Sequence, residues 1–150
     1  MWIALAVLAL DQLSKAMVRQ LPGERVLIPG ILRCRPVRNA GMAFSMLSGH
    51  TWLLTGLTAL ILLGILTWLV ARPDEPPLIR TGFWLILGGG LGNLLDRLLY
   101  GSVTDFLSLE FVRFAIFNVA DVFVCIGAAL AALGLLLSEQ RGEVKRHGPV

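Results

Sequence analysis

Two aspartates of this 150-residue chain stand out because the sequence gives neither of them a nearby basic partner. Asp105 lies in the segment GSVTDFL, with no Lys or Arg within five positions on either side, and apolar residues follow Asp121. If two such carboxyl groups come within hydrogen-bonding distance, they cannot both ionise cheaply, so they share one proton. One carboxylate then acts as a general base on water while its protonated partner hydrogen-bonds a scissile carbonyl, which is the chemistry of aspartic peptidases.

The alternative interpretation of the same two residues is structural, because Asp is a favourable residue at the N-terminus of a helix. Asn118 lies three residues before Asp121 and can donate a hydrogen bond to it, but it brings no compensating charge. From residue types and spacing alone, two unrelated helix caps and one shared catalytic site are both open.

Two further groups of polar residues lie near expected helix ends. Asp11 and Lys15 are four residues apart, so they can form an ion pair on one helix face, which favours a structural role. Asn93 shares a helix face with both Asp96 and Arg97, which lie three and four residues after it, and Arg97 can pair with a neighbouring carboxylate. Structural support and substrate binding both fit the spacing of this second group.

The remaining residues give little support to other chemistries. His50 and His147 are far apart, so the chain offers no Ser/His triad, no zinc-binding H-E-x-x-H motif and no Cys/His pair. Cys34 lies in a connector and Cys125 in an expected helix, a spacing that indicates neither a disulfide framework nor a metal site. We therefore expect no metal and no cofactor.

The composition indicates that these side chains belong to a protein of the lipid bilayer. Hydrophobic residues make up 56% of the chain and charged residues only 15%, which is typical of a bilayer protein. A membrane span needs about 20 mostly apolar residues. We predict a mainly α, four-transmembrane-helix membrane protein with a single domain over 1–150, its helices at about 1–20, 51–70, 79–99 and 114–137. The first is interpreted as a retained helix, because it lacks the basic leader and small-residue cleavage site of a signal peptide.

Four such helices place both termini on one side of the membrane and residues 21–50 and 100–113 together on the other. Segment 21–50 has β-type residues interrupted by Pro and Gly, which predicts short strands and turns. The side with this segment carries eight Lys and Arg residues against five on the other, so the positive-inside rule alone would make it cytoplasmic. Several of these residues can neutralise carboxylates, which weakens that count. The net charge of +3 forms no aromatic-rich basic patch, so we expect no nucleic-acid partner.

Four blocks, in order along nearly the whole chain, resemble the lipoprotein signal peptidases, or bacterial signal peptidase II. They are DQLSK at 11–15, NAGMAFS at 39–45, GGGLGNLLDRLLYGSVTDF at 88–106 and FNVAD at 117–121. The resemblance implies an aspartyl endopeptidase of the bacterial inner membrane that cleaves a prolipoprotein before its diacylglyceryl-modified cysteine and so removes the signal peptide. It also implies that both termini are cytoplasmic and that residues 21–50 form a small β-rich cradle on the extracytoplasmic face.

The same resemblance assigns the catalytic pair to Asp105 and Asp121. It places four residues near the substrate: Asn39, Asn93, Arg97 and Asn118. It places three more in a supporting network: Asp11, Lys15 and Asp96. The expected partners are prolipoproteins and membrane phospholipids, and the expected state is a monomer. The chain departs from the family in three ways: no basic stretch precedes the first helix, Val122 replaces a frequent Ser, and residues 108–116 contain no Trp.

Two other classes of protein fit the same unpaired carboxylates. A small proton-coupled transporter would use them as a relay inside the membrane. A structural protein of the bilayer would tolerate their replacement. Hydrolysis of a lipidated precursor distinguishes a peptidase from both.

Overall fold

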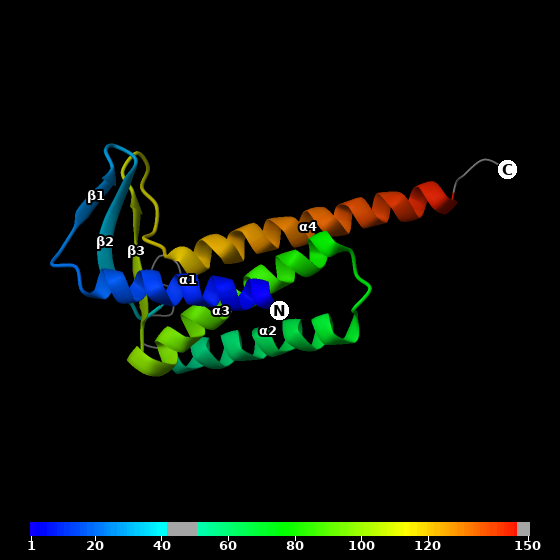
Figure 1. The fold of residues 1–150 in the computed structure, drawn as a ribbon, viewed down its shortest axis with the longest axis horizontal. Helices are drawn as coiled ribbons and strands as arrows, with labels where there is room; N and C mark the ends of the chain where they lie inside the picture. The colour runs from blue at the N-terminus through cyan, green and yellow to red at the C-terminus, as the bar shows by residue number, and fades with distance from the viewer. Residues whose placement is uncertain (42–50, 147–150) are drawn as a thin grey trace.

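The computed structural model describes residues 1–41 and 51–146, with side chains described up to residue 139. Four helices and three strands follow one another along the chain (Figure 1). In order, they are α1 (Trp2–Arg19), β1 (Arg25–Ile28), β2 (Leu32–Asn39), α2 (Thr51–Ala71), α3 (Pro77–Tyr100), β3 (Val103–Leu109) and α4 (Val119–Arg146). The helices lie roughly side by side, and the sheet stands across one end of the bundle (Figure 1). The mainly helical architecture with a small sheet is therefore confirmed.

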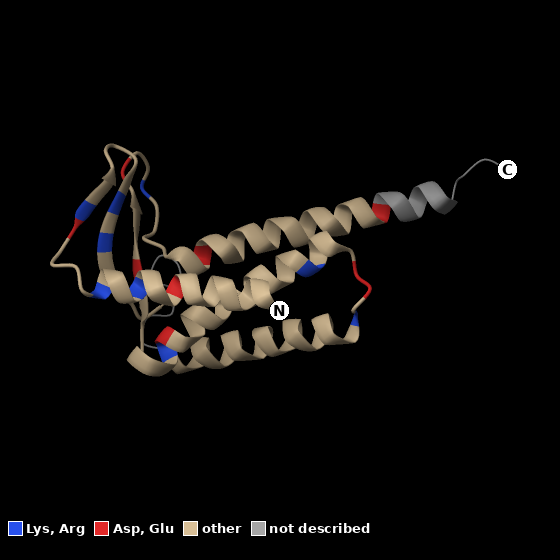
Figure 2. Ribbon diagram, viewed as in Figure 1, with Lys and Arg blue, Asp and Glu red and all other residues tan. Residues whose placement is uncertain are grey.

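Three of the helices are long and apolar enough to cross a membrane: α2, α3 and the Val119–Glu139 part of α4. Their apolar side chains point outward as well as inward, as Trp52, Leu60 and Val70 on α2 illustrate. Lys, Arg, Asp and Glu residues gather near the sheet and at the connector between α2 and α3, with few along the helices between (Figure 2). This distribution is that of a multi-pass membrane protein, because charged side chains are costly inside hydrocarbon.

The sheet is antiparallel, with strand order β1-β2-β3. Its first two strands lie in the segment for which strands were predicted, and residues 42–50 of that segment lie outside the described residues. The third strand, Val103–Leu109, was not predicted. It pairs with β2 in a register that places Asp105 opposite Val37 and Val103 opposite Asn39. Strand β3 therefore places Asp105 at the end of the helical bundle.

The last membrane helix was predicted at about 114–137, but α4 begins only at Val119; its apolar part runs to Glu139 and the helix continues to Arg146. Phe117 is held outside the helix by β3: its backbone N–H donates to Leu107, and its carbonyl accepts from Phe106 and Leu107. The helix therefore begins only after this backbone pairing ends. At the other end the polar residues beyond Leu137 continue the helix.

Helix α3 lies at the centre of the bundle and packs against α1, α2 and α4. Its glycines make this possible: a Cβ at Gly89 would lie 2.5 Å from the Ala120 carbonyl oxygen, and one at Gly88 would lie 2.7 Å from the Ala4 carbonyl oxygen. Such backbone approach is the use of small residues in membrane helix packing. It brings the first turn of α4 against the middle of α3, where Asn93 lies.

Candidate active site

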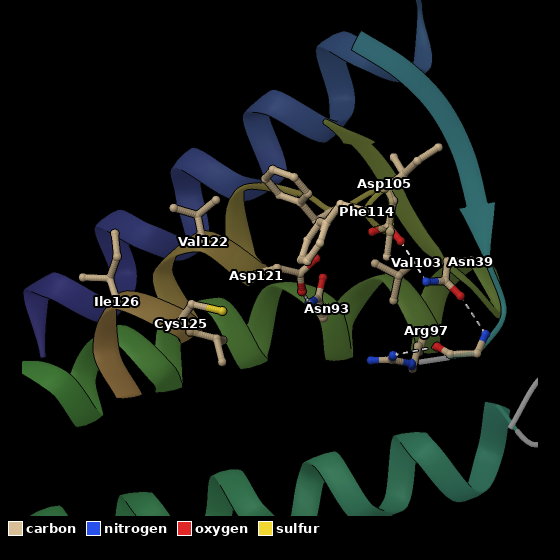
Figure 3. Close-up of a pocket in the computed structure, with 15 residues that line it drawn as sticks. Asn39, Asn93, Arg97, Val103, Asp105, Phe114, Asp121, Val122, Cys125 and Ile126 are labelled. Carbon is tan, nitrogen blue, oxygen red and sulfur yellow. Dashed lines mark hydrogen bonds between the residues drawn. The ribbon is translucent and has the colours of Figure 1, made fainter. Parts of the chain in front are cut away.

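A cavity of about 490 Å³ opens where β3, α3 and the start of α4 meet. Most of its lining is apolar, with Val103, Phe117 and Val122 among the wall residues. Polar side chains gather at one end and come from four separate parts of the chain (Figure 3). They are Asn39, Asn93, Arg97, Asp105 and Asp121. The cavity therefore combines an apolar groove with a small polar centre.

Asp121 occupies the first turn of α4, where it also caps the helix. The Asn118 side-chain oxygen accepts a hydrogen bond from the Asp121 backbone N–H at 3.0 Å, and Asp121 Oδ2 accepts one from the Asn118 backbone N–H at 3.1 Å. This reciprocal pattern is a capping box with Asp in place of the usual Glu. The predicted capping role of Asp121 is thus present. Its second oxygen, Oδ1, is left to face the polar centre, where it accepts from Asn93 Nδ2 at 2.8 Å.

Asp105 lies on β3 and is only 3% exposed. Its two oxygens accept hydrogen bonds from side-chain amides, Oδ1 from Asn118 at 2.7 Å and Oδ2 from Asn39 at 2.8 Å. Burial, with a further contribution from the negative charge of Asp121, raises the pKa of the Asp105 carboxyl group to about 6. The hydrogen bonds from Asn39 and Asn118 oppose this shift without cancelling it.

Asn118 connects the two carboxyl groups. Besides capping α4 with its oxygen, it donates from Nδ2 to Asp105 and, at 3.0 Å, to Asn93 Oδ1. It is completely buried. The structure therefore brings Asp105 and Asp121, from distant parts of the chain, into one polar centre, where Asn118 donates to Asp105 from its side chain and to Asp121 from its backbone N–H.

A buried ionic cluster lies behind this centre and supports it. The Lys15 ammonium group pairs with Asp11 at 2.9 Å, as the spacing predicted, and lies 3.7 Å from Asp96. Arg19 pairs with Asp96 at 2.7 Å, and Asp11 accepts a hydrogen bond from the Ala120 backbone N–H at 3.0 Å. The cluster thus ties α1 to α3 and to the first turn of α4. Its two positive and two negative charges balance, which offsets the cost of burying them.

Among the described residues Arg97 pairs with no carboxylate, although its spacing allowed such a pair. Its Nη2 donates to the Gly41 carbonyl oxygen at 3.2 Å, and its buried Nε has no hydrogen-bond partner there. The neighbouring carboxylate, Asp96, pairs with Lys15 and Arg19. Arg97 therefore brings a positive charge to the cavity wall, with donors available to a bound molecule.

Sequence reasoning missed three residues of this region: Gln12, Arg19 and Thr104. Gln12 donates to Asp11 at 3.0 Å, and Arg19 Nε donates to the Thr104 hydroxyl at 3.0 Å. Arg19 could have been found, because it follows Lys15 by four residues and so extends the same helix face. Thr104 offered no such local signal, since its backbone N–H meets Asp96 only through the fold.

The class of protein that these features define is a helical membrane protein with a two-carboxylate site, the kind of site that aspartic peptidases use. Comparison with known proteins gives the family. A family model described as signal peptidase (SPase) II matches residues 3–137. The chain therefore belongs to the signal peptidase II family.

Individual relatives agree with this family over most of the chain. The lipoprotein signal peptidase of Gloeobacter violaceus is 38% identical over 144 residues, covering 93% of this chain and 83% of that protein. That of Moorella thermoacetica is 41% identical over 138 residues, covering 90% of this chain and 91% of that protein. A bacterial membrane enzyme solved by the in meso method at 2.3 Å resolution matches with a TM-score of 0.88 and 28% identity, over 99% of this chain and 92% of that one.

Proposed function

We propose that this chain is an aspartic endopeptidase that removes the signal peptide from prolipoproteins by cleaving before the diacylglyceryl-modified cysteine, with Asp105 and Asp121 as its catalytic pair. Membership of the signal peptidase II family supports the reaction. The observation that carries the assignment of the pair is their position at the polar end of one cavity, where Asn118 donates to both carboxyl groups. The pair hydrolyses the peptide bond with water and needs no metal and no covalent intermediate.

The cavity fits such a substrate. A signal peptide and a diacylglyceryl group are both apolar, and the groove walls include Phe114, Phe117 and Ile126. At the polar end, Asn39 and Asn93 hold the two carboxyl groups, and Arg97 offers donors to the substrate's ester or carbonyl oxygens. The lipid and signal peptide therefore occupy the apolar groove while the scissile bond lies against the pair.

In the membrane, α1 forms a fourth span, both termini are cytoplasmic, and the sheet lies on the extracytoplasmic face of the bacterial inner membrane. The positive-inside count opposes this orientation, but many of the basic residues on the sheet side are already paired. Lys15 and Arg19 pair inside the bundle, and Arg33 and Arg35 pair with Glu24 on the sheet. The proposed orientation is supported by membership of the signal peptidase II family and not by the Lys and Arg count. The chain acts as one domain and as a monomer surrounded by phospholipid.

We expect activity to fall as the pH rises through about 6. A catalytic pair needs one proton, and the pKa of Asp105 is raised to about 6 from an ordinary 3.8, mainly by burial. Above this pH the proton is lost, so kcat/KM should fall about tenfold per pH unit. Thermal unfolding at each pH separates loss of the proton from loss of the fold. A rate that stays constant from pH 6 to pH 9 would contradict the shared proton.

The same pKa shift affects stability in a defined direction. The folded state holds the Asp105 proton more tightly than the unfolded chain does, so this group stabilises the fold fully below pH 4. That contribution, about 3 kcal/mol for a shift of two pKa units, is lost as the pH rises towards 6.

The proposed function is tested by incubating the purified protein in detergent with a lipidated prolipoprotein and, in parallel, with its unlipidated form. We expect cleavage before the modified cysteine in the first and little or none in the second. A protein that cleaves neither but conducts protons in liposomes would be a transporter, and the proposal would fail.

A further inference from the structure

Lys15 is fully buried on α1 and does not line the cavity, yet only one side chain, that of Asn93, separates its ammonium group from the Asp121 carboxyl group. Its Nζ donates to Asn93 Oδ1 at 2.8 Å, and Asn93 donates in turn from Nδ2 to Asp121 Oδ1 at 2.8 Å. A cation therefore reaches Asp121 through a single amide group. The ion pair with Asp11 accounts for the burial of Lys15 but not for this second contact.

The contact determines which way the Asn93 amide points. An amide can present either its oxygen or its nitrogen to a neighbour, whereas an ammonium group only donates hydrogen bonds. Lys15 therefore requires the Asn93 oxygen, and Asn118 Nδ2 donates to the same oxygen at 3.0 Å. The Asn93 nitrogen is left facing Asp121. In the reversed orientation, the amide oxygen would face the Asp121 carboxylate while its NH₂ group faced two donors.

Asp121 is consequently surrounded by donors. Asn93 donates to Oδ1, the Asn118 backbone N–H donates to Oδ2, and the N-terminus of α4 adds its positive end. All three place a hydrogen-bond donor or the positive end of a helix at Asp121, which is therefore positioned as a hydrogen-bond acceptor. Asp105 has a different environment: it lies on a strand, is 3% exposed and, among the described residues, accepts only from neutral side-chain amides. Burial without a helix N-terminus favours the neutral acid.

We propose that Lys15 is a positioning residue which, through Asn93, holds Asp121 as the proton-accepting member of the pair and leaves the shared proton on Asp105. This inference rests on the proposed function and assigns the two roles within it. Asp121 takes a proton from water as the water oxygen attacks the scissile carbonyl carbon, and Asp105 gives its proton to the carbonyl oxygen. Asp121 then protonates the leaving nitrogen, the C–N bond breaks, and a hydroxyl of the diol returns a proton to Asp105.

A double-mutant cycle tests whether Lys15 acts through Asn93, using Lys15→Met, Asn93→Ala and the combination, with the lipidated precursor as substrate. We expect each single change to lower kcat by about 10- to 100-fold with little change in KM. The combined variant should be no slower than Asn93→Ala, because the path from Lys15 is already broken. Losses that multiply in the combined variant would overturn the inference.

Arg19→Met is the matched control, because Arg19 belongs to the same ionic cluster and contacts Asp96 and Thr104 but not Asn93. We expect it to lower the unfolding temperature while changing kcat by less than about threefold. If Lys15→Met does not fold, the cycle is repeated with Lys15→Met and Asp11→Asn together, which removes both charges and keeps an oxygen for the Ala120 N–H. If the wild type cleaves the lipidated precursor but the losses in kcat of Lys15→Met and Asn93→Ala multiply in the combined variant, this inference is wrong and the proposed function is retained.

Discussion

Replacing either Asp105 or Asp121 by Asn should reduce cleavage of a lipidated precursor by about 10⁴-fold. Asn has nearly the shape of Asp but cannot carry the negative charge of the base or give up the proton of the acid. The combined Asp105→Asn and Asp121→Asn variant should be hardly slower than either single one, because the two groups act as one unit. Rates are measured with purified protein in detergent over single turnovers.

Folding must be measured beside these rates, because both carboxyl groups also accept structural hydrogen bonds. An Asn at 105 turns an NH₂ group towards Asn39 or Asn118, and each unsatisfied pair costs about 1–3 kcal/mol. Asp74→Asn is the control for the chemical change itself, since Asp74 is exposed in the connector between α2 and α3. It should cleave at the wild-type rate. A folded Asp105→Asn or Asp121→Asn enzyme with a near-normal rate would remove the pair from the mechanism.

The parts of the fold that the sequence predicted are those with local causes. The second span was predicted as 51–70 and observed as Thr51–Ala71, because an uninterrupted apolar run of this length has few alternatives in a membrane. Asp11 and Lys15 pair as predicted because four residues along a helix fix their distance. Each of these features depends on residues within one turn or one helix.

The features that were missed depend on contacts between distant segments. Strand β3 forms because Val103–Leu109 meets β2, more than sixty residues earlier in the chain, and its own pattern gave no clear strand signal. The start of α4 was misplaced because Phe117 pairs with Leu107, and no local rule identifies that pairing. For the same reason, the spacing of Arg97 allowed a carboxylate partner, whereas in the fold its Nη2 donates to the Gly41 carbonyl oxygen.

In the candidate site too, the features with local causes were predicted and those that depend on long-range contacts were not. In the sequence alone, the absence of basic residues near Asp105 and Asp121 distinguishes these two residues, and the family resemblance connects them. That Asn118 joins the two could not be predicted, since its amide reaches Asp105 across thirteen residues and Asn93 across twenty-five. The sequence showed Asn118 only as a neighbour of Asp121. Two roles were therefore open for it, as a helix cap and as a site residue.

Asn118→Ala should therefore lower both activity and stability. The change removes the donors to Asp105 and Asn93 and the side-chain acceptor for the Asp121 backbone N–H. We expect kcat to fall by about 100-fold and the free energy of unfolding to fall by about 1–3 kcal/mol. The first is measured with the lipidated precursor, and the second by denaturant unfolding in detergent at the same pH.

Asn118→Ser separates the two roles of this residue. Ser is a good N-cap, so its hydroxyl oxygen still accepts from the Asp121 N–H, and the stability should return to within about 1 kcal/mol of the wild type. The shorter side chain cannot also reach Asp105 and Asn93, so activity should stay as low as in Asn118→Ala. If Asn118→Ser recovers activity together with stability, Asn118 serves only to cap α4, and the bonds to Asp105 and Asn93 do not matter for cleavage. Recovery of stability alone would show that the amide holds the two carboxyl groups in their working positions.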